Sequence, residues 1–388
     1  MRRAGFLLAA TLVAFTASMA FYLLKPALAL RMRAEMGASA VEVAALTAGF
    51  MLSRALSATL AGVAADRRQG FTGDVVRFGL VPVAAVAAGY AFASVPVQAL
   101  VLSGVHGFLS GMLWLCMQVN VACAAGRGRR NTWLGVYFTA GTLGSAAGYA
   151  AYAALPLANR EVLMLAAGMY GVSAAVALLM LGDSLAMQRD VRREGEGFTA
   201  LTFWVLGVAF LAGGAAGLMN EYLYVFLTEV RGLSRVELGY MLAVATLAGA
   251  AGGVGAGYLA DRWSMRGVVR VLLLAAGAGL LGVAFLDSGM AVMLGVAGVV
   301  MASRALMPML RNVDIAGSGA AGTAVGLSNT LSNAGSALLP VAAGWVYEAS
   351  ASAWAGGAVF AACGVMMLGF AVLCPAGRRG LHTTAQAV

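Results

Sequence analysis

Two stretches of the sequence, GVAADRRQG at residues 62–70 and GYLADRWSMRG at residues 257–267, share the pattern Gly-x-x-x-Asp-Arg. Each closes a long apolar run, and Asp66 and Asp261 lie 195 residues apart, about half of the 388-residue chain. Glycine lets helices approach closely, and a carboxylate at a helix end can accept charge-assisted hydrogen bonds. A pattern that occurs twice at this separation predicts a chain built from two related halves.

The composition indicates a protein of the lipid bilayer. Of the 388 residues, 61% are hydrophobic and 11% are charged, which leaves too few polar groups to cover a surface exposed to water. The net charge of +9 comes from short basic clusters between apolar runs, with no continuous basic stripe that would follow a nucleic-acid backbone. We therefore expect the lipid bilayer as a partner and no nucleic acid.

Apolar runs that cross a hydrocarbon core of ~30 Å need about 20 residues. Twelve runs qualify: 5–30, 40–64, 74–95, 97–124, 132–155, 161–182, 199–228, 235–260, 267–286, 289–312, 320–346 and 352–374. Each is predicted to be a helix, because lipid cannot satisfy open backbone groups and the runs lack the alternation of barrel strands. The predicted fold class is an all-α integral membrane protein, with twelve transmembrane helices arranged as two pseudo-symmetric six-helix bundles.

The distribution of arginine predicts the orientation in the membrane. An even number of spans places both chain ends on the same side, and loops on that side hold eighteen arginines. The other side holds five: Arg31, Arg33, Arg160, Arg231 and Arg235. Because arginine accumulates in cytoplasmic loops, both termini are predicted to be cytoplasmic, and the predicted location is the cell membrane.

The longest polar interruption begins at Asp183, near the midpoint of the chain. It divides the sequence into four predicted parts. They are an N-terminal six-helix bundle (1–182), a cytoplasmic linker (183–198), a C-terminal six-helix bundle (199–375) and a cytoplasmic tail (376–388).

Two sequence shifts relate the predicted halves. A shift of 195 residues places GASAVE at 37–42 on GLSRVE at 232–237, and the Ser-x-x-Glu element in both predicts a capping box that opens spans two and eight. A shift of 191 residues matches six positions of the segment 132–146 to the segment 323–337. Two matched blocks with similar shifts indicate parallel halves around an axis along the membrane normal.

Spans arranged as six plus six, with Gly-x-x-x-Asp-Arg after spans two and eight, resemble the major facilitator superfamily over essentially the whole chain. The resemblance implies a transporter whose cytoplasmic loop motif latches the two halves together. The matching residues are Gly62, Asp66, Arg67 and Gly70, then Gly257, Asp261 and Arg262. Ser145 stands where the proton-coupled exporters of this family carry proline, and span four lacks their arginine. Both departures disfavour a standard drug–proton antiporter.

The resemblance also implies that spans one, four, seven and ten line a central cavity, with span eleven beside it. A spacing of four residues places the polar side chains of span four on one helical face, and ionisable groups inside spans are functional candidates because burying them is costly. The cavity candidates are His106, Ser110, Trp114, Gln118, Glu221, Arg304, Asn329 and Asn333.

Each of these candidates has an alternative interpretation. Small polar stripes also serve hydrogen bonding between helices. His106 is either a proton carrier, since histidine titrates near neutral pH, or a neutral hydrogen-bonded fixture. Arg304 either holds an anionic substrate group or reaches toward the cytoplasmic lipid headgroups.

Lys25 and Glu221 are predicted to form an external gate. The 195-residue shift places Lys25 on Asn220, directly before Glu221, so the two charges lie at similar depths in spans one and seven. A charge inside a membrane benefits from a partner of opposite sign. The alternative is that Lys25 reaches external water while Glu221 is a proton site.

The sequence contains no glycine-rich phosphate loop, no metal-ligand spacing and only two histidines, so we expect no enzyme, no metal and no cofactor except a coupling proton. The leading hypothesis is a monomeric secondary active transporter that moves a small organic solute by alternating access. The surplus of cations over acids among the polar span residues favours an anionic or zwitterionic solute. The alternatives are proton-coupled efflux of amphipathic compounds and, from another class, a membrane sensor or scaffold without transport.

Overall fold

The computed structural model describes residues 3–67, 70–125, 130–181, 200–262, 265–317, 321–349 and 353–373. In these ranges all regular structure is helical. The predicted linker (183–198) and the predicted tail (376–388) lie outside the described residues.

Every predicted span corresponds to one helix or to consecutive helices. The first six spans are α1 (Arg3–Glu35), α2 (Ala40–Arg67), α3 (Phe71–Phe78) with α4 (Leu80–Phe92), α5 (Pro96–Ala125), α6 (Arg130–Ala154) and α7 (Asn159–Met180). The last six are α8 (Ala200–Leu218) with α9 (Glu221–Val225) and the π-helical turn η2 (Phe226–Val230), α10 (Arg235–Arg262), α11 (Met265–Phe285), α12 (Gly289–Gly317), α13 (Ala321–Ala349) and α14 (Ala353–Val372). Within the described residues, seven spans are long and apolar enough to cross a membrane, or eight with the bent pair of α8 and α9–η2. The full count of twelve crossings stays a prediction.

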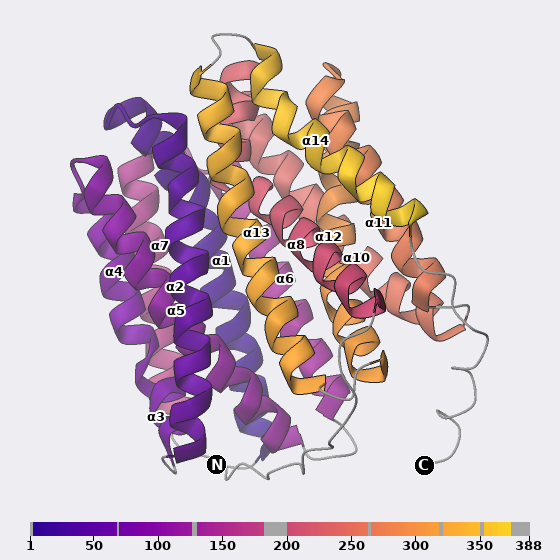
Figure 1. Ribbon diagram of the computed structural model, residues 1–388. Helices are drawn as coiled ribbons and strands as arrows, with labels where there is room; N and C mark the ends of the chain where they lie inside the picture. Colours follow the sequence, from indigo (N-terminus) through magenta and orange to yellow (C-terminus); the bar gives the residue numbers. More distant parts are fainter. Residues whose placement is uncertain are drawn as a thin grey trace.

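The helices pack as two groups. α1 to α7 pack mainly against one another, as do α8 to α14, and Figure 1 shows the indigo-to-magenta helices beside the red-to-yellow ones. We call the groups the N-terminal half and the C-terminal half. They meet chiefly along two edges, where α2 packs against α13 and α6 packs against α10, while α9 packs on α1 and α2. We call the end of the molecule where α1 ends and α2 begins the distal end.

Glycines set the close approach of helices inside each half. A Cβ added at Gly144 of α6 would lie 2.9 Å from the carbonyl carbon of Phe15 in α1, and one added at Gly335 of α13 would lie 2.9 Å from that of Phe210 in α8. The shift of 195 residues relates Phe15 to Phe210, and the shift of 191 relates Gly144 to Gly335. The two halves therefore repeat the same small-residue contact, as expected for packing in lipid.

The predicted capping boxes are confirmed at the distal end. The amide of Ser39 donates to Glu42 Oε2 at 2.8 Å and the amide of Ser234 donates to Glu237 Oε2 at 2.9 Å, at the starts of α2 and α10. Gly37 and Gly232 precede them with φ of 66° and 67°, a left-handed conformation that strains any side chain with a Cβ. The same turn therefore opens the second span of each half.

Two distal arginines, which entered the sequence analysis only in predicting the membrane orientation, bind the C-terminal ends of neighbouring helices. Arg31 donates to the carbonyls of Tyr90 and Ala93 at the end of α4, at 2.7 and 3.1 Å. Arg231 donates to the carbonyls of Val283 and Ala284 at the end of α11, at 3.2 and 2.7 Å. A guanidinium satisfies the open carbonyls of a helix C-terminus and suits the negative end of its dipole.

Candidate functional site

The seventh span is broken where it faces α1. α8 ends at Leu218, Asn220 has φ −104° and ψ −137°, and the helix restarts at Glu221 with a bend of 43°. Nδ2 of Asn220 donates to the carbonyl of Ala216 at 3.0 Å, which gives this carbonyl a side-chain partner near the break. Such a break is tolerated at membrane depth when neighbouring groups satisfy the backbone. Here it presents the Asn220 oxygen and the Glu221 carboxylate to the N-terminal half.

Lys25 of α1 reaches this break. Its Nζ lies 3.3 Å from Oε1 of Glu221 and donates to Oδ1 of Asn220 at 2.8 Å. Oγ1 of Thr47 in α2 donates to the other carboxylate oxygen of Glu221. The Lys25 and Glu221 side chains are 4% and 8% exposed, so each charge is compensated where it is buried. The predicted contact is present, and its role as a gate stays a prediction.

Aromatic rings surround this ion pair. Nζ of Lys25 lies 4.8 Å from the ring centroid of Phe21, within the range of a cation–π contact. The hydroxyls of Tyr149 in α6 and Tyr224 in α9 lie 2.7 Å apart, and the Tyr22 ring packs edge-on against Tyr149 with centroids 5.2 Å apart. Near the pair, the two halves therefore also meet through tyrosines that join α1 and α6 to α9.

His106 lies inside the N-terminal half. Its ring packs edge-on against Phe21, Phe50 and Tyr170, and it is 1% exposed. Nε2 of His106 lies 3.4 Å from the Tyr170 hydroxyl, a weak hydrogen bond. These partners belong to α1, α2 and α7, which supports the alternative interpretation of His106 as a fixed packing residue.

The other span-four candidates have separate surroundings. Ser110 is buried, and Gln118 is half-buried. The Trp114 ring is half-buried and lies edge-on to Tyr137 of α6, with centroids 6.0 Å apart. The candidates on this helical face are therefore buried near the distal end, at His106 and Ser110, and half-buried nearer the other end, at Trp114 and Gln118.

Arg304 of α12 contacts the opposite half. Its NH1 donates to Oγ1 of Thr142 in α6 at 2.8 Å, and the side chain is half-buried. In the part of the chain that the structure describes, no carboxylate pairs with it. A guanidinium held by a neutral hydroxyl retains most of its capacity to bind an anion.

The polar residues Asn329, Asn333 and Ser336 of α13 differ in their surroundings. Asn329 and Asn333 are half-buried. Ser336 donates to the carbonyl of Gly213 in α8 at 2.6 Å, as expected for hydrogen bonding between helices. Ser336 therefore joins α13 to α8, while the cavity role of the two asparagines stays a prediction.

The cytoplasmic loop motif lies at the end opposite the distal end. α2 runs to Arg67 and α10 to Arg262, so both copies close a long helix as expected. Gly70, the last residue of the first quoted stretch, adopts φ 85° and precedes α3, whereas Gly267, the last residue of the second, lies within α11. The latch stays a prediction, because the described part of the chain does not include the side chains that would form it: those of Asp66, Arg67, Asp261 and Arg262.

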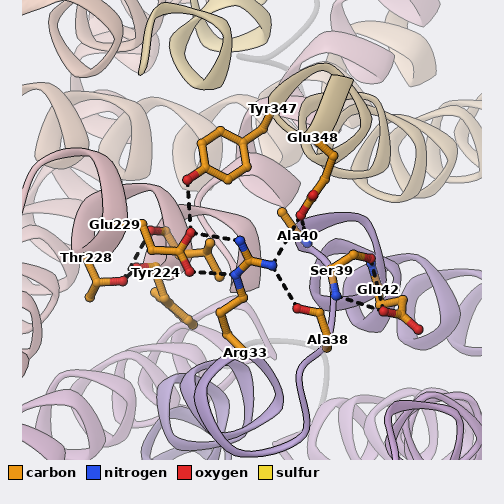
Figure 2. A network of polar contacts seen from close by, with 11 residues as sticks. Arg33, Ala38, Ser39, Ala40, Glu42, Tyr224, Thr228, Glu229, Tyr347 and Glu348 are labelled. Atoms are coloured by element: carbon orange, nitrogen blue, oxygen red, sulfur yellow. Dashed lines mark hydrogen bonds and ion pairs between the residues drawn. The ribbon is translucent and has the colours of Figure 1, made fainter. Parts of the chain in front are cut away.

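A second charged cluster, which the sequence analysis missed, lies at the distal rim (Figure 2). Nε and NH2 of Arg33 lie 2.6 and 3.1 Å from the two carboxylate oxygens of Glu229. NH1 of Arg33 lies 3.2 Å from Oε1 of Glu348 and 2.9 Å from the Ala38 carbonyl, and the Tyr347 hydroxyl donates to Glu229 at 2.9 Å. This rim cluster joins α1 to η2 and α13.

The sequence contained a signal for the rim cluster. The shift of 195 residues places Arg33 on Thr228, the neighbour of Glu229, just as it places Lys25 on Asn220, the neighbour of Glu221. The same reasoning that predicted the buried pair therefore applies to the rim pair.

Two similar helical halves with polar groups at their interface are a common design of solute transporters. The sequence profile of the Major Facilitator Superfamily matches residues 10–340, most of the chain. The chain belongs to the major facilitator superfamily, and it is a multi-pass membrane transporter of small molecules, not an enzyme. A search of curated protein sequences finds no significant match.

Solved structures of transporters share the fold. A bacterial homologue of the human lysosomal transporter Spinster, inward-facing and unoccupied, aligns with TM-score 0.71 and 17% identity over 96% of this chain and 95% of that one. The nucleoside transporter NupG aligns with TM-score 0.74 and 11% identity, over 95% and 98%. The human organic anion transporter MFSD10 aligns with TM-score 0.63 and 18% identity, over 97% and 100%. At these identities the similarity establishes the fold alone.

Proposed function

We propose that this protein moves a small organic solute by alternating access, and that the distal end is its external gate. The observation that carries the proposal is the buried Lys25–Glu221 pair, which joins α1 to the break in the seventh span across the two halves. The rim cluster and the tyrosine contact lie on the same distal side of the interface. The described conformation is therefore closed at the distal end.

The orientation follows from arginine placement. The distal loops carry few arginines, so the distal end faces outward and both termini are cytoplasmic, in the cell membrane. A conformation closed at the distal end is then inward-facing, the state named for the Spinster homologue of the same fold. The Asp66 and Asp261 motifs would close the opposite end in the other state.

The pair suits a gate because its two charges depend on their mutual attraction only while both are buried. In the closed state each neutralises the other out of contact with water. When the halves part, water hydrates both charges and replaces the lost attraction. Removing one partner from the closed state leaves an uncompensated buried charge, at a cost of about 3–5 kcal/mol.

The substrate class proposed is an organic anion or zwitterion bound by Arg304. Its guanidinium has a neutral partner, Thr142, at the interface of the halves, and its forked donors match a carboxylate or phosphate. The half-buried Trp114 ring offers apolar surface for the organic part of such a solute. MFSD10, which has the same fold, is named an organic anion transporter.

A second candidate is proton-coupled efflux of amphipathic compounds. It is favoured by the tyrosine cluster of Tyr22, Tyr149 and Tyr224 beside the Glu221 carboxylate, since aromatic rings with polar tips suit amphipathic solutes. In this candidate Glu221 takes up the coupling proton and releases Lys25. The sensor or scaffold alternative has no observation in its favour.

A thermal-shift panel on purified protein separates the two candidates. Organic anions, zwitterions, neutral solutes and amphipathic cations are screened at two pH values against wild type and Arg304→Gln, with Arg160→Gln as the control for loss of an arginine. We expect anions or zwitterions to stabilise wild type and Arg160→Gln but not Arg304→Gln. Stabilisation by amphipathic cations that is unaffected by Arg304→Gln would favour efflux.

A further inference from the structure

The two edges along which the halves meet at the distal end use equivalent positions in different ways. The shift of 195 residues relates Ala40 to Arg235, and the shift of 191 relates Leu157 to Glu348. At the α2–α13 edge, Oε1 of Glu348 accepts the amide of Ala40 at 2.6 Å. At the α6–α10 edge, NH1 of Arg235 donates to the carbonyl of Leu157. The same pair of positions touches at both edges, with an acid at one edge and a base at the other.

The α2–α13 edge is ionic and partly open to water. Arg33, from the N-terminal half, binds two carboxylates from the C-terminal half, Glu229 and Glu348 (Figure 2). The three side chains are 28%, 30% and 37% exposed. Glu348 also holds the N-terminus of α2 through Ala40, where the positive end of the helix dipole favours a carboxylate. This edge therefore relies on charges that water and salt can reach.

At the α6–α10 edge an arginine binds neutral groups. Nε of Arg235 donates to the carbonyl of Tyr152 at 3.1 Å, and its guanidinium lies 4.3 Å from the ring centroid of that fully buried tyrosine. Tight packing does not distinguish the two edges: a Cβ added at Gly239 would lie 2.6 Å from Cβ of Ala153, and one added at Gly344 of α13 would lie 2.9 Å from the backbone nitrogen of Val41 in α2. In the described part of the chain, Arg235 pairs with no carboxylate at this edge. Parting this edge would separate Arg235 from the ring and the carbonyls that hold it, without releasing any of the described ion pairs to water.

We propose that the distal end opens asymmetrically, with the α2–α13 edge releasing first and the α6–α10 edge staying together as the pivot. Arg33 controls the release, because it is the residue that holds both carboxylates of the opposite half. Both edges are packed, so their polar contacts make the difference. An exposed ion pair loses little free energy when its members pass into water, whereas Arg235 would lose its cation–π contact with a buried ring. The inference rests on the proposed alternating access and adds where the external gate parts.

Distance measurements between spin labels test the order of opening. Two cysteine pairs are introduced into full-length protein whose four native cysteines are replaced by alanine. Ala34→Cys, at the end of α1 beside the start of α2, with Ala349→Cys of α13 reports on opening at the α2–α13 edge. Ala154→Cys with Val236→Cys reports on the α6–α10 edge, and all four positions are exposed. Double electron–electron resonance then gives both distance distributions without any substrate.

The expected result of Arg33→Gln is a rise of roughly fivefold in the long-distance population at the α2–α13 edge. A change of this size corresponds to the free energy that an exposed ion pair contributes. The distribution at the α6–α10 edge stays unchanged. Arg235→Gln is the matched control, and it leaves the α2–α13 distribution as in wild type. Wild type in about 1 M NaCl, where screening acts within ~3 Å, reproduces the effect of Arg33→Gln.

Equal widening of both edges in Arg33→Gln would overturn the proposal while leaving alternating access intact. If Arg33→Gln does not fold, Glu348→Gln and the salt series on wild type replace it. No change at the α2–α13 edge in either would also overturn the proposal. If the protein opens asymmetrically but transports no solute, the proposed transport function is wrong and this inference is unaffected.

Discussion

The Lys25–Glu221 and Arg33–Glu229 pairs both join α1 to the seventh span, and the same sequence shift relates both. They are eight residues apart on α1, about 12 Å along the helix. The first pair is 4% and 8% exposed, and the second is 28% and 30% exposed. Burial is thus the main difference between them. It decides which pair the fold depends on and which pair only adjusts a conformational equilibrium, because solvent weakens the second far more than the first.

The largest effect is expected from removing one member of the buried pair. Lys25→Met leaves the Glu221 carboxylate buried without a cation, so the free energy of unfolding should fall by about 3–5 kcal/mol. Denaturant titration in detergent measures it. The control is the double variant Lys25→Met with Glu221→Gln, which removes both charges and should recover most of the stability. Equal loss in the single and double variants would show that packing, and not charge compensation, stabilises this site.

A matched pair of hydroxyl deletions compares the two pairs directly. Thr47→Val removes the buried donor to Glu221, and Tyr347→Phe removes the partly exposed donor to Glu229. A buried hydrogen bond to a charged group contributes about 1.5–3 kcal/mol, so Thr47→Val should lower the free energy of unfolding by this amount. Tyr347→Phe should lower it by less than about 0.5 kcal/mol, because water replaces the lost donor. Similar losses in both variants would contradict the role given to burial.

Among the substitutions that remove a charge, the smallest effect is expected at the rim. Glu229→Gln should change the free energy of unfolding by about 1 kcal/mol or less. The difference from wild type should shrink in high salt, because the Debye length falls to about 3 Å at 1 M. The same salt series on Lys25→Met is the comparison, and there the difference should persist. A salt-independent effect of Glu229→Gln would place the rim pair in the same class as the buried pair.

Much of the fold could be predicted because its signals are local. Apolar length identifies the spans, Ser-x-x-Glu identifies the starts of α2 and α10, and the repeat relates one half to the other. The contact of Lys25 with the seventh span followed from the repeat and from the cost of an isolated charge. The break at Asn220 was not predicted, since Met219, Asn220 and Glu221 fit a continuous helix in sequence.

The candidate site was harder to predict because helical spacing defines a face and not its neighbours. His106 and Trp114 lie on one face of α5, yet His106 packs among α1, α2 and α7 while Trp114 contacts α6. Arg33 was counted for topology, and nothing local separates an arginine that marks a loop from one that binds across the halves. Which partner a side chain meets depends on tertiary packing, and the repeat was the only sequence feature that carried such information.

The most direct test of the gate is a charge swap with transport as the readout, using the solute that stabilises the purified protein in the thermal-shift panel. Lys25→Glu and Glu221→Lys each place two like charges together, and each should reduce uptake into proteoliposomes by about tenfold or more. The double variant restores the opposite pair in reversed order, and it should recover a good part of the activity. A double variant as impaired as both singles would contradict the gate and assign Glu221 to proton coupling.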